Sequence, residues 1–147
     1  MKTPTGWVLD CECGLENGIN AVLHKYEKTW QNAKTVMYLN FANFDIENQR
    51  NLNDLISYDT STFKENYEGI KIYTKEKIEL DQFHGIIKYF GGGTYQSFEY
   101  LAYLDLKEFA IMTVISSKSK SDLDANYLDF IKLLESITLI PLEFKDK

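Results

Sequence analysis

Two cysteines and two histidines are the side chains in this sequence best suited to hold a metal ion. Cys11 and Cys13 form a C-x-C pair, and His24 and His84 lie far apart along the chain. Four such ligands suffice for zinc, but structural zinc sites usually space their cysteines as C-x2-C, and each histidine falls in a separate predicted strand. We therefore predict no metal site, and the sequence contains no motif for another cofactor.

The same residues are the best candidates for nucleophilic catalysis, which needs a thiol or hydroxyl beside a base. Cys11 or Cys13 could pair with His24, which leads out of the neighbouring predicted turn. A reactive thiolate needs electropositive surroundings, whereas Asp10 and Glu12 make this segment acidic. The G-x-S-x-G elbow of hydrolases is absent from the sequence. We therefore predict that the protein is not an enzyme and has no catalytic residue.

The glycine run Gly91–Gly93 has the composition of a phosphate-binding loop. Such a loop leads from a strand into a helix and carries Lys followed by Ser or Thr. Here Thr94 and Tyr95 follow, and then a predicted strand. The run therefore predicts a reversal between two strands, where glycine supplies positive φ angles.

Two carboxylates, Glu99 and Asp105, stand out because both interrupt a predicted apolar strand. Paired carboxyl groups can carry acid–base chemistry when burial without a partner raises a pKa. The simpler expectation is that they lie near the strand ends or pair with a lysine such as Lys88.

Aromatic side chains could form a contact surface. Seven of interest lie mostly in predicted strands: Tyr26, Trp30, Tyr38, Tyr89, Tyr95, Tyr100 and Tyr103. Strands favour these residues for packing alone, so a core position is the default. Exposed and clustered aromatic rings would mark a contact patch. Trp30 and Tyr95 lie near predicted loops and are our candidates for such a surface.

Length and charge exclude several classes of function. The 147 residues suit one domain spanning 1–147. The net charge is −6 and Arg50 is the only arginine, so we predict no nucleic-acid partner. No apolar run approaches the roughly 20 residues of a membrane helix, so we predict no transmembrane segment. We expect a monomer or a weak dimer.

Hydrophobic periodicity places the elements that would position these side chains. The predicted strands cover residues 6–9, 19–26, 35–42, 70–74, 83–90, 96–106 and 108–116. Residues 10–18 are expected to be rich in turns, and residues 74–82 either extend the fourth strand or form a turn.

Two amphipathic helices are predicted. The first carries an apolar stripe from Leu52 to Phe63, with Asn51 as its N-cap and Asp59 as the one polar residue in the stripe. The second begins in the capping-box-like segment Ser121–Asp124 and continues to residue 137.

The strands over residues 96–106 and 108–116 are apolar on both faces at their centres. In the first, Tyr100 and Leu104 point to one face, while Leu101 and Tyr103 point to the other. A sheet that is apolar on both faces is covered on both. Two helices then predict an α+β fold, a three-layer α/β/α sandwich on a mainly antiparallel sheet of six or seven strands. One helix covers each face, in the order β-β-β-α-β-β-β-β-α.

Short packing motifs are spread over nearly the whole chain. They are Gly6-Trp7, Ala21-Val22-Leu23 followed by Trp30, Val36-Met37-Tyr38-Leu39-Asn40, Leu52-Asn53-Asp54-Leu55-Ile56, Tyr100-Leu101-Ala102-Tyr103 and the closing Leu-Leu-Glu-Ser-Ile. Together with the element order, they resemble bacterial PsbP-related members of the Mog1/PsbP-like group. The resemblance implies a non-enzymatic domain that binds another protein or assists assembly, and it implies no catalytic residue.

Three hypotheses for function follow. The first is a non-catalytic protein-interaction or assembly module with a protein partner. The second is a small-molecule binder with an aromatic-lined pocket between sheet and helix. The third is an immunity- or chaperone-type binder of a basic effector protein, motivated by the acidic charge. The given N-terminus carries no signal segment, so we expect a cytoplasmic protein as given, or a secreted protein or lipoprotein if such a segment was removed.

Overall fold

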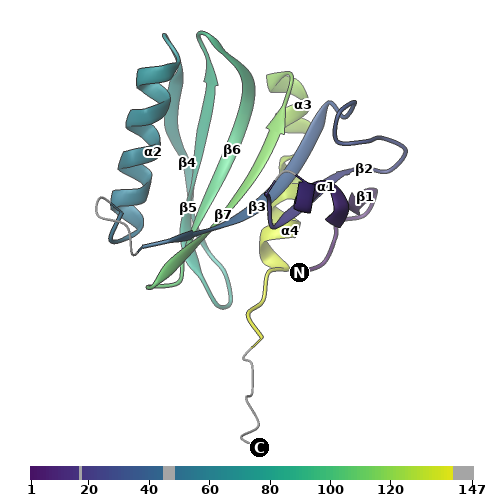
Figure 1. The fold of residues 1–147 in the computed structure, drawn as a ribbon, viewed down its shortest axis with the longest axis horizontal. Coiled ribbons are helices and arrows are strands. Elements are labelled where there is room, and N and C mark those ends of the chain that lie inside the picture. Colours follow the sequence, from purple (N-terminus) through teal and green to yellow (C-terminus); the bar gives the residue numbers. More distant parts are fainter. Residues whose placement is uncertain (17, 45–48, 141–147) are drawn as a thin grey trace, which may run out of the picture.

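Seven strands form one antiparallel sheet with helices on both of its faces (Figure 1). The computed structural model describes residues 1–16, 18–44 and 49–140. The strands are β1 (Trp7–Leu9), β2 (Ala21–Lys25), β3 (Thr35–Asn43), β4 (Lys71–Glu79), β5 (His84–Gly92), β6 (Tyr95–Asp105) and β7 (Phe109–Ser117). The helices are α1 (Cys11–Glu16), α2 (Leu52–Asn66), α3 (Lys120–Ala125) and α4 (Tyr127–Glu135). The strand order is β1-β2-β3-β7-β6-β5-β4, which confirms the predicted α+β class.

Helix α2 packs on one face of the sheet, and α3 with α4 packs on the other. Tyr100 and Leu104 of β6 belong to the core that includes Phe130 of α4. Their neighbours Leu101 and Tyr103 belong to the second core, under α2. The alternation along this strand therefore predicted the three layers correctly.

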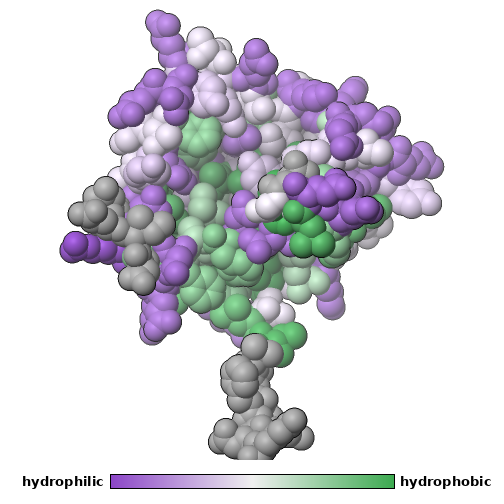
Figure 2. Space-filling model, viewed as in Figure 1, coloured by the Kyte–Doolittle hydropathy of each residue, from purple (hydrophilic) through white to green (hydrophobic). Residues whose placement is uncertain are grey.

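The sheet is wider than α2, so part of the α2 side stays open. On β3, Met37 and Leu39 face α4 and are buried, whereas Tyr38 and Asn40 on the α2 side are half-buried. Helix α1 lies over the far end, where Gly14 approaches Val22 of β2. We call the half-buried stretch of β3 and β7 between α2 and α1 the open face. It consists of Val36, Tyr38, Asn40, Ala42, Met112 and Ser116. Figure 2 shows apolar side chains gathered in the hollow between α2 and α1.

The helix ends show which local signals decide the boundaries. Asn51 caps α2 as predicted, since its side chain accepts a hydrogen bond from the Asp54 amide. Residues 10–18, expected to be turns, instead contain α1, where the Asp10 carboxylate accepts from the Cys13 amide at 2.9 Å. Residue 17 lies outside the described residues.

The C-terminal helix begins earlier than predicted and is divided in two. Ser119, rather than Ser121, is its N-cap and accepts from the Asp122 amide. Asn126 then interrupts the helix between α3 and α4, with φ −105° and ψ 5°. No helix of the described residues is both long enough and apolar enough to cross a membrane.

Strand β4 is an edge strand that runs the full length from Lys71 to Glu79. Residues 74–82 therefore mostly extend the fourth strand, which was one of the two expected outcomes. The pairing with β5 shifts register between Thr74 and Glu76, so Lys75 forms a bulge. Most of β4 is exposed.

Candidate functional site

A cavity of about 200 Å³ lies between α2 and the open face. Residues from α2, β3 and β6 that line it are Tyr38, Asn40, Asp59, Phe63, Tyr95 and Glu99. The spacing of these residues explains why they meet. Asp59 and Phe63 are four apart on a helix, and Tyr95 and Glu99 are an even number apart on a strand. The cavity therefore combines two carboxyl groups with aromatic rings.

Glu99 is the most buried charged residue of this cavity, with 5% of its surface exposed. Its carboxylate accepts hydrogen bonds from the Tyr95 and Ser116 hydroxyls. Burial raises the pKa of Glu99 above its ordinary value, and the two hydrogen bonds lower it by less. Among the ion pairs of the described residues, none joins Glu99 to Lys88 or to another cation. The expected lysine partner is therefore replaced by hydroxyl groups.

Asp59 brings a second carboxyl group to the cavity from α2. One of its oxygens accepts a hydrogen bond from the buried Tyr103 hydroxyl at 2.9 Å. Burial raises the pKa of Asp59, while the bond from Tyr103 acts to lower it. This contact explains the one polar residue in the apolar stripe of α2. The sequence showed that Asp59 interrupts the stripe, but it did not show that Tyr103 would be its hydrogen-bond donor.

Three aromatic rings line the cavity, those of Tyr38, Phe63 and Tyr95, and further rings pack against them. Trp30 packs edge-on against Tyr38, with ring centroids 6.0 Å apart. Tyr95 packs edge-on against Phe63 at 5.4 Å and also contacts Tyr67, with centroids 4.6 Å apart. Burial raises the pKa of the Tyr38 and Tyr95 hydroxyls.

The two predicted contact residues thus lie near one region of the fold. Trp30 and Tyr95 are both half-buried. Tyr95 lines the cavity directly, whereas Trp30 packs against Tyr38, which lines it. Their role as a contact surface remains a prediction. Sequence analysis missed Glu99 as a buried group and Asp59 as its neighbour in the cavity lining. The signal that could have indicated their burial was the position of each carboxylate on the apolar side of its element, β6 for Glu99 and α2 for Asp59.

The two histidines lie far apart in the sheet. His24 lies in β2 and His84 in β5, with three strands between them. At about 4.8 Å per strand, this separation is roughly 19 Å, too far for one metal ion. Both ring nitrogens of His24 are engaged, Nε2 with Asp10 at 3.5 Å and Nδ1 with the Lys25 carbonyl at 2.9 Å. Within the described residues, no group of three or more Cys, His, Asp or Glu is arranged to hold a metal.

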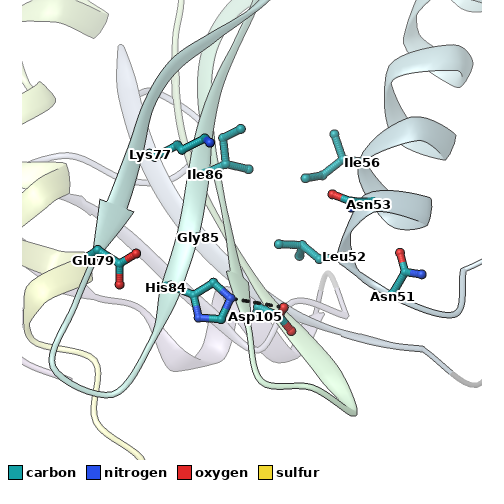
Figure 3. Close-up of a pocket in the computed structure, with 10 residues that line it drawn as sticks. All are labelled: Asn51, Leu52, Asn53, Ile56, Lys77, Glu79, His84, Gly85, Ile86 and Asp105. Carbon is teal, nitrogen blue, oxygen red and sulfur yellow. Dashed lines mark ion pairs between the residues drawn. The ribbon is translucent and has the colours of Figure 1, made fainter.

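A second, larger cavity of about 450 Å³ lies where α2 begins, against β4 and β5 (Figure 3). His84 and Asp105 line it from the sheet, with Nε2 and Oδ2 separated by 3.5 Å. Leu52 and Ile56 of α2 face them across the cavity, and Lys77 adds a positive charge from β4. Asp105 thus lies at the end of its strand, as expected.

The glycine run forms the reversal that its composition predicted. Gly92 ends β5 and Gly93 follows it, with φ angles of 83° and 58°. The Thr94 amide donates to the Glu68 carbonyl at 2.9 Å. The run therefore joins two strands and leads into no helix.

On the opposite face, Tyr100 forms a polar contact that the sequence did not reveal. Its hydroxyl donates to Asp124 at 2.7 Å, and the Lys120 ammonium donates to both Asp124 oxygens at 2.7 and 2.6 Å. Burial and the bond to Asp124 raise the pKa of Tyr100 to about 12. Lys120 lies over the rings of Tyr89 and Tyr100 at 5.3 and 5.4 Å. These contacts attach α3 to the sheet.

Comparisons with known proteins identify the fold. No protein-family model and no curated protein matches the chain. Among solved structures, it is similar to the PsbP protein CyanoP of Synechocystis sp. PCC 6803, with a TM-score of 0.54 and 12% identity over 93% of this chain and 84% of that one. It is also similar to PA94 of Pseudomonas aeruginosa, a protein of unknown function, with a TM-score of 0.53 and 8% identity over 84% and 76% of the two chains. Similarity at this level of identity concerns the fold alone. The fold is PsbP-like, as the sequence resemblance implied.

Proposed function

We propose that this protein is a non-catalytic binding module that holds a basic segment of a partner protein against its open face. The observation that carries the proposal is the open face, whose side chains are only half-buried on the α2 side of the sheet. Apolar side chains that are left partly exposed together on one surface mark an interaction site, whereas scattered ones do not. Here β3 and β7 are central in the strand order, yet Tyr38 and Met112 on this side are only half-buried.

Charge supports a basic partner rather than an acidic one. The chain carries a net charge of −6, and two carboxyl groups line the cavity beside the open face. Complementary charge speeds encounter and selects against acidic partners. The rings of Trp30, Tyr38 and Tyr95 add the aromatic surface that is enriched at protein interfaces. The fold likeness to CyanoP and the sequence resemblance to the Mog1/PsbP-like group agree with a binding role.

The test is a site-specific crosslink. Met112 is replaced by a photoreactive phenylalanine at the centre of the open face, and Leu128 is replaced in the same way as a control. Leu128 is 73% exposed on α4, on the other side of the sheet. Purified protein is irradiated in soluble and envelope extracts of the native host. We expect one discrete protein adduct from position 112 and none from position 128. Equal labelling from both positions, or no protein adduct from position 112, contradicts the proposal.

The cavity at the start of α2 favours the small-molecule alternative. Its volume of about 450 Å³ is within the range of ligand pockets, roughly 300–1,000 Å³. A ligand there would meet His84, Asp105 and Lys77 as polar groups and Leu52 and Ile56 as apolar ones. Thermal-shift screening with Ile56→Trp as the blocked control tests this site. A compound that raises Tm in the wild type and not in the variant supports the alternative.

A further inference from the structure

Among the described residues, the lining of the cavity beside the open face includes two carboxyl groups and no Lys, Arg or His side chain. Neither Glu99 nor Asp59 takes part in an ion pair recorded among the described residues. Their hydrogen-bond donors are neutral hydroxyls, from Tyr95, Ser116 and Tyr103. A buried carboxylate usually has a cationic partner or coordinates a metal. Hydroxyl donors stabilise the charge only in part, as the raised pKa of both groups shows.

We infer that this cavity is the binding site for an organic cation, supplied by the partner as a single arginine or lysine side chain. The inference rests on the proposed function and specifies what the open face recognises. Glu99 and Asp59 would accept charge-assisted hydrogen bonds from the guanidinium or ammonium group. Such bonds are shorter and roughly twice as strong as neutral ones.

The size and lining of the cavity fit this occupant. Its volume of about 200 Å³ exceeds that of the ~150 Å³ engineered cavities that take up benzene. A flat guanidinium on an alkyl stem therefore has room. Tyr38, Tyr95 and Phe63 line the same space, and aromatic faces attract a cation within about 6 Å. Leu101 and Met112 provide apolar contact for the alkyl stem.

The same lining argues against a metal ion as the occupant. Calcium takes six to eight oxygen ligands, and magnesium requires near-ideal octahedral geometry. This cavity presents two carboxyl groups and the Asn40 amide among aromatic and aliphatic side chains. One oxygen of Asp59 is already engaged by Tyr103. An organic cation needs fewer oxygens and uses the rings.

The test compares two peptides that differ only in charge. Each has one central residue flanked by apolar residues. That residue is arginine in the first peptide and its neutral isostere, citrulline, in the second. Binding to the purified full-length protein is measured by NMR titration, which also locates the site. Free butylguanidinium is titrated in parallel, to distinguish a protein side chain from a small organic cation.

Variants of matched charge identify the carboxylate responsible. Glu99→Gln removes the buried charge and keeps the shape, and Asp59→Asn serves if the first variant does not fold. Glu65→Gln changes the net charge equally from an exposed position on α2. Thermal unfolding of each variant checks that it is folded.

We expect the arginine peptide to bind at least about tenfold more tightly than the citrulline peptide. This ratio falls to near one in Glu99→Gln and is unchanged in Glu65→Gln. Butylguanidinium binds more weakly than the arginine peptide, because it lacks contacts on the open face. Equal affinity for the two peptides overturns the inference, as does an unchanged ratio in Glu99→Gln. Butylguanidinium binding as tightly as the peptide overturns the assignment of the cation to a protein. In each of these cases a crosslink from position 112 would still support the proposed function.

Discussion

Two tyrosines of one strand allow a paired test of how the helices are attached to the sheet. Tyr103 donates to Asp59 of α2 at 2.9 Å, and Tyr100 donates to Asp124 of α3 at 2.7 Å. Replacing either by Phe removes one hydroxyl and leaves the ring. A hydrogen bond to a charged group contributes about 1.5–3 kcal/mol. No other side chain of the described residues donates to Asp59, so we expect Tyr103→Phe to lower the free energy of unfolding by about 2 kcal/mol.

The same change at Tyr100 should have a smaller effect. Asp124 keeps both of its contacts with the Lys120 ammonium, at 2.7 and 2.6 Å. It is also half exposed, so water can replace the lost donor. We therefore expect Tyr100→Phe to cost less than about 1 kcal/mol.

Urea denaturation at two pH values measures both effects. For a chain of this length, about 2 kcal/mol corresponds to a loss of roughly 4–8 °C in Tm. The bond from Tyr103 lowers the pKa of Asp59, so its removal raises the folded-state pKa further. The deficit of Tyr103→Phe is therefore present at pH 7 and shrinks as the pH falls through the raised folded-state pKa of Asp59, because the carboxyl group is then protonated in the fold of both proteins. Equal losses for the two variants, or a deficit that grows in acid, would refute the reasoning.

Three further predictions follow from burial and backbone geometry. Glu99→Gln should become more stable relative to the wild type as the pH rises above the unfolded glutamate pKa of about 4.3. The reason is that the raised pKa of Glu99 makes its ionised form unfavourable in the fold. Denaturation across pH 4–8 checks this, and a relative stability that does not change with pH argues against it. Phe130→Ala should lower the unfolding free energy by about 3–5 kcal/mol, since the ring is fully buried; a loss below about 1 kcal/mol in calorimetry would contradict its place in the core. Gly93→Ala should destabilise the hairpin, because φ is +58° and a Cβ would lie 2.1 Å from the Glu68 carbonyl oxygen; amide exchange of β5 and β6 should speed up, and unchanged exchange would be inconsistent with this geometry.

The layers could be predicted from the sequence because strand alternation is a local signal. Tyr100 and Leu101 point to opposite faces whatever else the chain does, and both are apolar enough to require cover. The N-cap of the C-terminal helix was harder to predict, because more than one serine within a few residues could fill that position. Ser119 and Ser121 both precede acidic residues at the start of the helix, and it is Ser119 whose hydroxyl accepts from the Asp122 amide.

The candidate site could not be predicted because its residues meet only in the folded chain. Glu99 and Asp59 are 40 positions apart in sequence and come from a strand and a helix. Sequence analysis identified each as an interruption of an apolar pattern, without relating one to the other. The part of the sheet that α2 covers also depends on the length of the helix relative to the width of the sheet. This is a property of the assembled layers rather than of any single segment.

The bulged edge strand β4 affects whether copies of this protein can pair edge to edge at high concentration. An exposed strand edge is a template on which amyloid can grow. The exposed residues Lys71, Glu76 and Lys77 would carry their charges into any such stack, and the bulge at Lys75 breaks the straight row of backbone groups. Lys75 is also held back over the Tyr127 ring at 5.2 Å. We therefore expect this edge to be a poor seed for fibrils.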